Sequence, residues 1–371
     1  MQVGRKVVED LLAGTGVEID GSRPWDIRVR DDRFYGRVLK DGSLGLGEAY
    51  MEGWWDCDQI DEFICRILRG KLQEKIRANI RTILFYIVAR LCNLQSLSRA
   101  GIIARKHYDL GNELFFSFLD SRNQYSCGYF ENTDDLEEAQ EKKLELICRK
   151  LDLQPDDRLL DIGCGWGGLA RYAAEQYGCS VTAVNISEEQ IRHAREICKG
   201  LPVEVVATDY RRISGHYDKI VSVGMFEHVG RKNYREFMDV VSRSLNDDGV
   251  FLLHTIGGNL SRVNCDPWIN RYIFPNGMLP SIAQIGKAAE GRFVVEDLHN
   301  MGPHYEKTLL CWYDRFQCAR DRLPEKYDDV FKRMWEYYFL SCAGAFRARH
   351  IQVWQIAMTK TGAKQTPLLR A

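Results

Sequence analysis

The stretch Leu159-Leu160-Asp161-Ile162-Gly163-Cys164-Gly165-Trp166-Gly167-Gly168 decides the fold of this chain. An apolar strand ends near an acidic residue, glycines follow, and a helical pattern begins at Leu169. The glycines at 163 and 165 let the backbone come close to a ligand, and the first amides of the helix face that ligand. The stretch therefore predicts a strand, a binding loop and a helix; the alternative is a glycine turn without a ligand.

The spacing of the glycines and the acid indicate which ligand this loop would bind. The pattern is Gly-x-Gly-x-Gly, whereas dinucleotide sites have Gly-x-Gly-x-x-Gly. The Asp161 carboxylate would repel a pyrophosphate, but it suits the ammonium group of a cationic ligand. The loop thus favours S-adenosylmethionine over NAD.

The pattern beyond residue 136 alternates strands with helices, which is typical of an α/β fold with a parallel sheet covered on both faces. Two later apolar runs could add an antiparallel pair at the sheet edge. We expect strands at 158–162, 180–184, 203–207, 219–223, 250–255, 293–298 and 352–358. We expect helices at 169–177, from Ser187 with a capping box to Gln190, and at 234–245 before the Asp247-Asp248-Gly249 turn.

The chain is expected to have three parts. Residues 1–95 form a small, mainly helical N-terminal domain that could contact lipid, 96–135 form a linker that covers the cofactor, and 136–371 form the catalytic domain. The stretch 65–106 holds ten cations and one acid among apolar residues at a roughly helical spacing. Such a stretch favours an anionic membrane surface.

Composition excludes several classes of protein. The 371 residues carry a net charge of −1, which does not suggest a nucleic-acid partner. Twelve cysteines without a Cys-x-x-Cys pair indicate reduced thiols in a cytoplasmic protein, with neither a disulfide framework nor a metal site. The N-terminus has no apolar core of a signal peptide, and the longest apolar run is too short to span a bilayer.

Ligands of such sheets bind beyond the carboxyl ends of the strands, so the residues there are candidate ligand contacts. They are Asp161, Gly163, Gly165, Asn185, Gln190, Asp209, Tyr210, Glu227 and His254. Asn185 and Gln190 could instead cap a helix, and Asp209 could serve a turn before Arg211. Glu227 and His254 follow apolar strands, where an unpaired polar group costs about 1–3 kcal/mol.

Several further motifs make the chain resemble the cyclopropane-fatty-acyl-phospholipid synthases of the enterobacterial type. They are Gly42 to Tyr50 with Gly53-Trp54-Trp55, His107 to Asn112, Gln124 to Cys127, Leu160 to Gly168, Val223 to Gly230, His254 to Gly257, Trp268 to Gly277 and Cys342 to Arg347. The resemblance covers nearly the whole chain. It implies a Rossmann-like methyltransferase sheet of seven strands, the last pair antiparallel, with a smaller N-terminal domain.

The resemblance also implies an activity and its residues. A methylene group would pass from S-adenosylmethionine to the cis double bond of an acyl chain in a membrane phospholipid. Tyr125, Ser126, Gly163, Gly165, Asn185, Gln190, Asp209 and Tyr210 would surround the cofactor, in addition to Asp161, which the glycine loop itself suggests. Cys127, Glu227, His254, Tyr305 and the Ile256 backbone would hold a bicarbonate ion as the base. A homodimer at the cytoplasmic side of the inner membrane is expected.

Two alternatives remain at this point. Another S-adenosylmethionine enzyme, such as a lipid methyltransferase that makes branched chains or a small-molecule methyltransferase, would share the cofactor-binding half. A nucleic-acid-binding protein would use the basic stretch 65–106. The phospholipid headgroup and the position of the double bond do not follow from the sequence.

Overall fold

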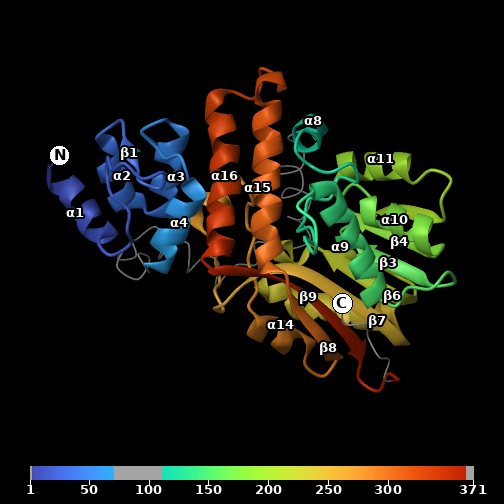
Figure 1. Cartoon of the computed structure of the whole chain (residues 1–371). Coiled ribbons are helices and arrows are strands. Elements are labelled where there is room, and N and C mark those ends of the chain that lie inside the picture. The colour runs from blue at the N-terminus through green and yellow to red at the C-terminus, as the bar shows by residue number, and fades with distance from the viewer. Residues whose placement is uncertain (1, 71–110, 365–371) are drawn as a thin grey trace. The chain divides into compact units, whose positions relative to one another are not determined.

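The computed structural model describes residues 2–70 and 111–364 (Figure 1). The chain divides into two compact units. Among the described residues, the first comprises 2–70, 264–275 and 306–351, and the second comprises 111–263, 276–305 and 352–364.

The second unit is built on a seven-stranded sheet in the order β5-β4-β3-β6-β7-β9-β8. Its strands are β3 (Arg158–Ile162), β4 (Ser180–Asn185), β5 (Val203–Ala207), β6 (Tyr217–Val223), β7 (Leu245–Gly258), β8 (Phe293–Asn300) and β9 (Ile351–Lys360). The pairs from β5 to β7 are parallel, and β8 pairs antiparallel with β9 at the edge. The predicted α/β fold with an antiparallel last pair is confirmed.

Helices cover both faces of this sheet. They are α9 (Leu136–Lys150), α10 (Gly168–Tyr177), α11 (Glu188–Ile197), α12 (Tyr234–Ser244) and α14 (Ile282–Ala289). The unit also contains the short helix α8 (Asn112–Phe116) and 3-10 turns at Tyr210–Arg212, Phe226–His228 and Arg231–Asn233. Leu160 packs in one apolar core with residues of α12 and α14, whereas Leu159 packs in another with residues of α9 and α10. Successive strand residues point to opposite faces, so the sheet is buried on both.

Two local predictions were wrong in detail. The helix predicted to end at 245 ends at Ser244, because Leu245 already pairs with Tyr217 at the start of a long β7. The reciprocal capping box at Ser187 is incomplete. Ser187 does accept from the Gln190 amide, but the Gln190 side chain accepts from Asn185 instead of reaching back.

The first unit is mainly helical, as predicted for the N-terminal part. It contains α1 (Gln2–Leu12), α2 (Arg33–Asp41), α3 (Ser43–Met51), α4 (Ile60–Arg69), α13 (Pro267–Tyr272), α16 (Asp329–Arg347), the short strands β1 (Arg28–Val29) and β2 (Trp55–Asp56), a 3-10 turn at Arg320–Arg322, and α15 (Gly302–Ala319) from Glu306 onward. Fully buried Trp55 contacts Phe63 and Tyr337 at its core. Segments distant in sequence thus share this core, and the functional division into three parts stays a prediction.

Most of the basic stretch 65–106 lies outside the described residues, and two of its cations lie within them. Arg66 forms an ion pair with Glu62 at 2.8 Å, and its guanidinium stacks 3.9 Å from the centre of the Trp25 ring. Arg69 donates to the carbonyl of Arg347 at 3.1 Å. These two cations therefore have partners within the first unit. Among the described helices, none has the length and apolar character needed to cross a bilayer.

Candidate active site

The glycine loop after β3 is held against the next strand. The amides of Gly163 and Cys164 both donate to the Val184 carbonyl, at 2.9 and 3.1 Å. Gly163 has φ +86°, and a Cβ there would come within 2.7 Å of Met225. Gly165 has φ +55°, and a Cβ added there would meet no other atom within 4 Å. The loop thus requires glycine at 163 for packing, and it leaves open space at 165.

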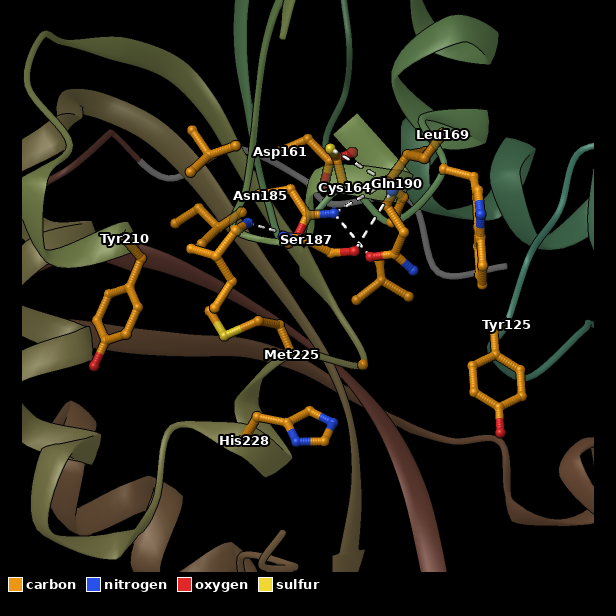
Figure 2. A pocket seen from close by; sticks show the side chains of 18 of the residues that line it. Tyr125, Asp161, Cys164, Leu169, Asn185, Ser187, Gln190, Tyr210, Met225 and His228 are labelled. Atoms are coloured by element: carbon orange, nitrogen blue, oxygen red, sulfur yellow. Dashed lines mark hydrogen bonds between the residues drawn. The ribbon is translucent and has the colours of Figure 1, made fainter. Parts of the chain in front are cut away.

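A pocket lies at the carboxyl ends of the central strands, where the sequence predicts it (Figure 2). It is lined by residues that follow β3, β4, β5 and β6 and by the segment 123–126 that precedes α9. Figure 2 shows Asn185, Ser187 and Gln190 grouped near Asp161 and Cys164, with Tyr125 and Tyr210 on opposite sides of the view. Every residue predicted to surround the cofactor lines this pocket.

Asp161 brings a carboxylate into the pocket wall at high energetic cost. Its side chain is 1 % exposed, and Oδ2 has no hydrogen-bond partner. Burial raises the pKa of Asp161 to about 7, although the nearby Lys143 ammonium works in the opposite direction. A buried carboxylate with an oxygen that lacks a partner is stabilised by a cationic ligand. This geometry fits a ligand that carries an ammonium group.

Asn185 and Gln190 form one hydrogen-bonded unit. The Asn185 amide nitrogen donates to the Gly165 carbonyl at 3.1 Å and to Gln190 Oε1 at 3.0 Å. Asn185 Oδ1 accepts from the amide of Ile186 at 2.7 Å. Asn185 therefore braces the glycine loop and orients Gln190. Of the two, Gln190 keeps its amide nitrogen outside these bonds, so it is the better candidate for a ribose contact.

Asp209 and Tyr210 are placed by the turn after β5. Asp209 accepts two bonds from the Arg211 guanidinium, at 2.8 and 2.9 Å, and one from the Arg211 amide. The Tyr210 ring packs against Phe237, and its buried hydroxyl has no hydrogen-bond partner. The turn role considered for Asp209 is thus present. A contact from Asp209 to an adenine would have to share oxygens that Arg211 already binds.

The segment that carries Tyr125 and Ser126 is fixed by two buried side chains of α9. Lys143 Nζ donates to Gln124 Oε1 at 2.6 Å and to Ser126 Oγ at 3.0 Å. Gln140 donates to the carbonyls of Gln124 and Ser126, at 3.3 and 2.9 Å. Burial lowers the pKa of Lys143 to about 8. Sequence reasoning missed both residues, because each reads as an ordinary polar position of an amphipathic helix.

Glu227 is hydrogen-bonded to the backbone of Ile256, and His254 lies two residues before Ile256 on β7. The Ile256 amide donates to Glu227 Oε1 at 2.6 Å, while Glu227 Oε2 is buried without a hydrogen-bond partner. Burial raises the pKa of Glu227 to about 7, against the lowering effect of the Ile256 amide. His254 and Ile256 are two residues apart on β7, so their side chains share a face. Gln355 of β9, which sequence reasoning also missed, lies 3.3 Å from His254 Nδ1.

Cys127 and Tyr305 belong to neighbouring segments of the same unit. Fully buried Cys127 has its sulfur 3.8 Å from the carbonyl of Met301, four residues before Tyr305. Tyr305 lies in the first turns of α15 and is 6 % exposed. The residues predicted to hold bicarbonate are not among the described residues that line the pocket. The side chains of Cys127, Glu227, His254 and Tyr305 are buried, as a site shielded from water requires.

Comparisons with known proteins agree with this geometry. Residues 95–356 match the family model of mycolic acid cyclopropane synthetase. The chain is 52 % identical over 355 residues to the cyclopropane-fatty-acyl-phospholipid synthase of Escherichia coli strain K12, covering 96 % of this chain and 93 % of that one. It is 36 % identical to a probable fatty acid methyltransferase of Pseudomonas putida, covering 94 % and 91 %.

A solved structure gives the same result for the fold. A mycolic acid cyclopropane synthase in complex with SAH and CTAB matches with a TM-score of 0.65 and 34 % identity. The match covers 70 % of this chain and 98 % of that chain. The ligand named there is the demethylated form of the cofactor that the glycine loop and Asp161 predict.

Proposed function

This chain belongs to the mycolic acid cyclopropane synthetase family, and we propose that it transfers a methylene group from S-adenosylmethionine to the cis double bond of acyl chains in membrane phospholipids, forming a cyclopropane ring. The observation that carries the proposal is the 52 % identity over 96 % of the chain to a protein of that activity. The pocket adds support, because the buried Asp161 carboxylate, whose Oδ2 has no hydrogen-bond partner, suits the ammonium group of the methyl donor.

The chemistry makes modest demands on acid–base groups at the first step. An alkene has no proton to lose before it attacks the sulfonium methyl, so alignment of the two supplies much of the acceleration. The glycine loop and the 123–126 segment would hold the donor. A carbocation then forms beside the new methyl group, and a methyl proton must leave before water reacts. The site must therefore be dry and must contain a base.

We propose that the buried set Cys127, Glu227, His254, Tyr305 and the Ile256 amide holds a bicarbonate ion. When bound, this ion supplies the base that accepts the methyl proton. One observation fits a small anion at this place. Glu227 Oε2 and His254 Nε2 are both buried atoms without hydrogen-bond partners, so both are available to a bound ion. Glu227, with its pKa raised to about 7 by burial, can carry a proton and donate it to an oxyanion.

A substrate embedded in a bilayer requires the protein to work at the membrane surface. We propose that it binds anionic membranes peripherally and that it acts as a homodimer. The basic stretch 65–106 supports the first part by its charge. Light scattering of the purified protein tests the second part.

The activity is tested with unsaturated phospholipid vesicles and S-adenosylmethionine labelled in its methyl group. Mass spectrometry of the acyl chains should show the gain of one labelled CH₂ together with loss of alkene reactivity.

A second candidate is methyl branching, which the 36 % identity to a probable fatty acid methyltransferase favours. A labelled chain that keeps a double bond would support branching and contradict ring formation.

A further inference from the structure

His254 has one ring nitrogen bonded to a glutamine and the other without a partner. The ring lies in β7, 1 % exposed, with Gln355 Nε2 of the neighbouring strand β9 at 3.3 Å from Nδ1. Gln355 is fully buried. His254 Nε2, Gln355 Oε1 and Glu227 Oε2 are all buried without a hydrogen-bond partner. The hydrogen-bonding role of the ring is therefore decided by which atom of the Gln355 carboxamide faces Nδ1.

We propose that Gln355 is a positioning residue that holds His254 as the neutral tautomer with its proton on Nε2, so that Nε2 donates to an anion bound beside Glu227. The inference rests on the function proposed above. A carboxamide nitrogen can only donate, so Nδ1 must be the unprotonated acceptor. A neutral imidazole carries one proton, which is then on Nε2.

The surroundings keep this imidazole neutral. Burial lowers the pKa of His254 to about 3, and the charges of Lys143, Lys150 and His299 lower it further. Lys143 and Lys150 lie on α9, and His299 lies on β8 opposite Gln355. A neutral donor binds an oxyanion without the full charge of an imidazolium. The bound anion therefore stays more basic than it would beside a cation, which suits a proton acceptor.

The reversed carboxamide would make the opposite site. Gln355 Oε1 would accept from His254 Nδ1–H. His254 Nε2 would then carry no proton and would present a lone pair to the anion. A lone pair aimed at an anion repels it, so that arrangement does not suit an anion site.

The cost of burying Gln355 argues for a specific role. Its neighbours on the same face of β9, Val353 and Ala357, are apolar and buried. An unsatisfied buried carbonyl costs about 1–3 kcal/mol, so an apolar residue of similar volume would be favoured at this position by packing alone. The carboxamide is therefore explained better by its bond to His254 than by stability.

The test reads the tautomer directly by ¹⁵N NMR of protein labelled in its histidines. The His254 signals are assigned as those missing from the His254→Asn variant. In the wild type we expect the proton on Nε2, and added bicarbonate should shift the Nε2 resonance. In Gln355→Glu a carboxylate accepts from Nδ1–H, so the proton should move to Nδ1 and the response to bicarbonate should be lost.

Kinetics and a control complete the test. Gln355→Glu and Gln355→Met should lower kcat about 10–100-fold while the Kd for S-adenosylmethionine stays unchanged. Thr359→Val is the matched control, because it removes another buried hydrogen bond from β9, the 2.7 Å bond to Glu296. It should leave the tautomer unchanged.

Two outcomes overturn the proposal, and the first is read in the wild-type protein without any change at Gln355. One is a wild-type His254 with its proton on Nδ1 or with a charged ring. The other is a Gln355→Met protein whose kcat falls although its tautomer and bicarbonate response are those of the wild type. If the tautomer is as expected but phospholipid alkenes are not modified, the positioning role stands and the proposed reaction fails.

Discussion

The buried Asp161 carboxyl group is costly to ionise in the unliganded protein, and this cost predicts how ligand binding depends on pH. Its carboxyl group has a pKa raised to about 7 by burial, whereas an exposed aspartate titrates near 4. Between about pH 4 and 7 this group lowers the stability of the unliganded fold as pH rises, because ionisation is disfavoured in the folded state. A cationic ligand reverses that preference, so binding and ionisation are coupled.

We therefore expect the affinity for S-adenosylmethionine to rise about tenfold between pH 6 and pH 8 through this residue. Calorimetric titration of wild type and Asp161→Asn across that range isolates the contribution, because the ligand's own titration is common to both. The variant should bind weakly with little of this pH dependence. Equal slopes in the two proteins would remove Asp161 from the ligand contacts.

Cys127 offers a second test of a single residue. A thiol in a buried polar set could donate a hydrogen bond to an anion, or it could act as a nucleophile. Cys127→Ser keeps a donor of similar size. We expect partial activity that drops when dissolved CO₂ is stripped and returns on adding bicarbonate, as in the wild type. A correctly folded Ser variant without any turnover would favour covalent catalysis, which needs an electrophile that an alkene lacks.

Helix α9 acts as the support of the pocket segment 123–126. Lys143 and Gln140, three residues apart and so on one face of the helix, bind Gln124 and Ser126 by four hydrogen bonds. Loss of the two Lys143 hydrogen bonds should increase the motion of segment 123–126 and leave the sheet intact. This predicts a change in ligand binding without loss of the fold.

Lys143→Met should speed hydrogen exchange of residues 123–127 and weaken S-adenosylmethionine binding about tenfold, the effect expected for losing one charged hydrogen bond. Lys150→Met is the matched control on the same helix. Lys150 is also buried, but its partner is Asp297 at 3.2 Å, so exchange in the segment should stay as in the wild type. Faster exchange in both variants alike would mean that α9 is merely destabilised.

Elements and their order were predictable from the sequence, whereas the supports of the site were not. Strand ends, the glycine loop and Asp161 follow from short apolar runs and from glycines, which are local signals. Lys143 and Gln355 are recognised only when distant segments meet, because a lysine on a helix and a glutamine in a strand each have ordinary local explanations. The packing of α13 and α16 with the N-terminal helices is likewise non-local.

At the scale of the whole molecule, the proposed substrate lies in a bilayer, so the proposed function requires the protein to concentrate at a membrane surface. The described cations Arg66 and Arg69 already serve the first unit, since they bind Glu62 and the Arg347 carbonyl. The remaining cations of the stretch 65–106 lie outside the described residues, and their role in membrane binding stays a prediction. A useful variant therefore spares Arg66 and Arg69.

We expect Lys71, Lys75 and Arg77 replaced together by Gln to weaken binding to anionic vesicles by about 1 kcal/mol per charge, and less at high salt. Sedimentation with vesicles at low and high salt measures this. The matched control replaces three exposed cations elsewhere, Arg30, Arg192 and Lys364, whose side chains are 61, 75 and 86 % exposed. Because both variants lose the same charge, a general electrostatic effect would weaken both equally. Only a local membrane-binding stretch weakens the first and spares the second, with S-adenosylmethionine affinity unchanged in each.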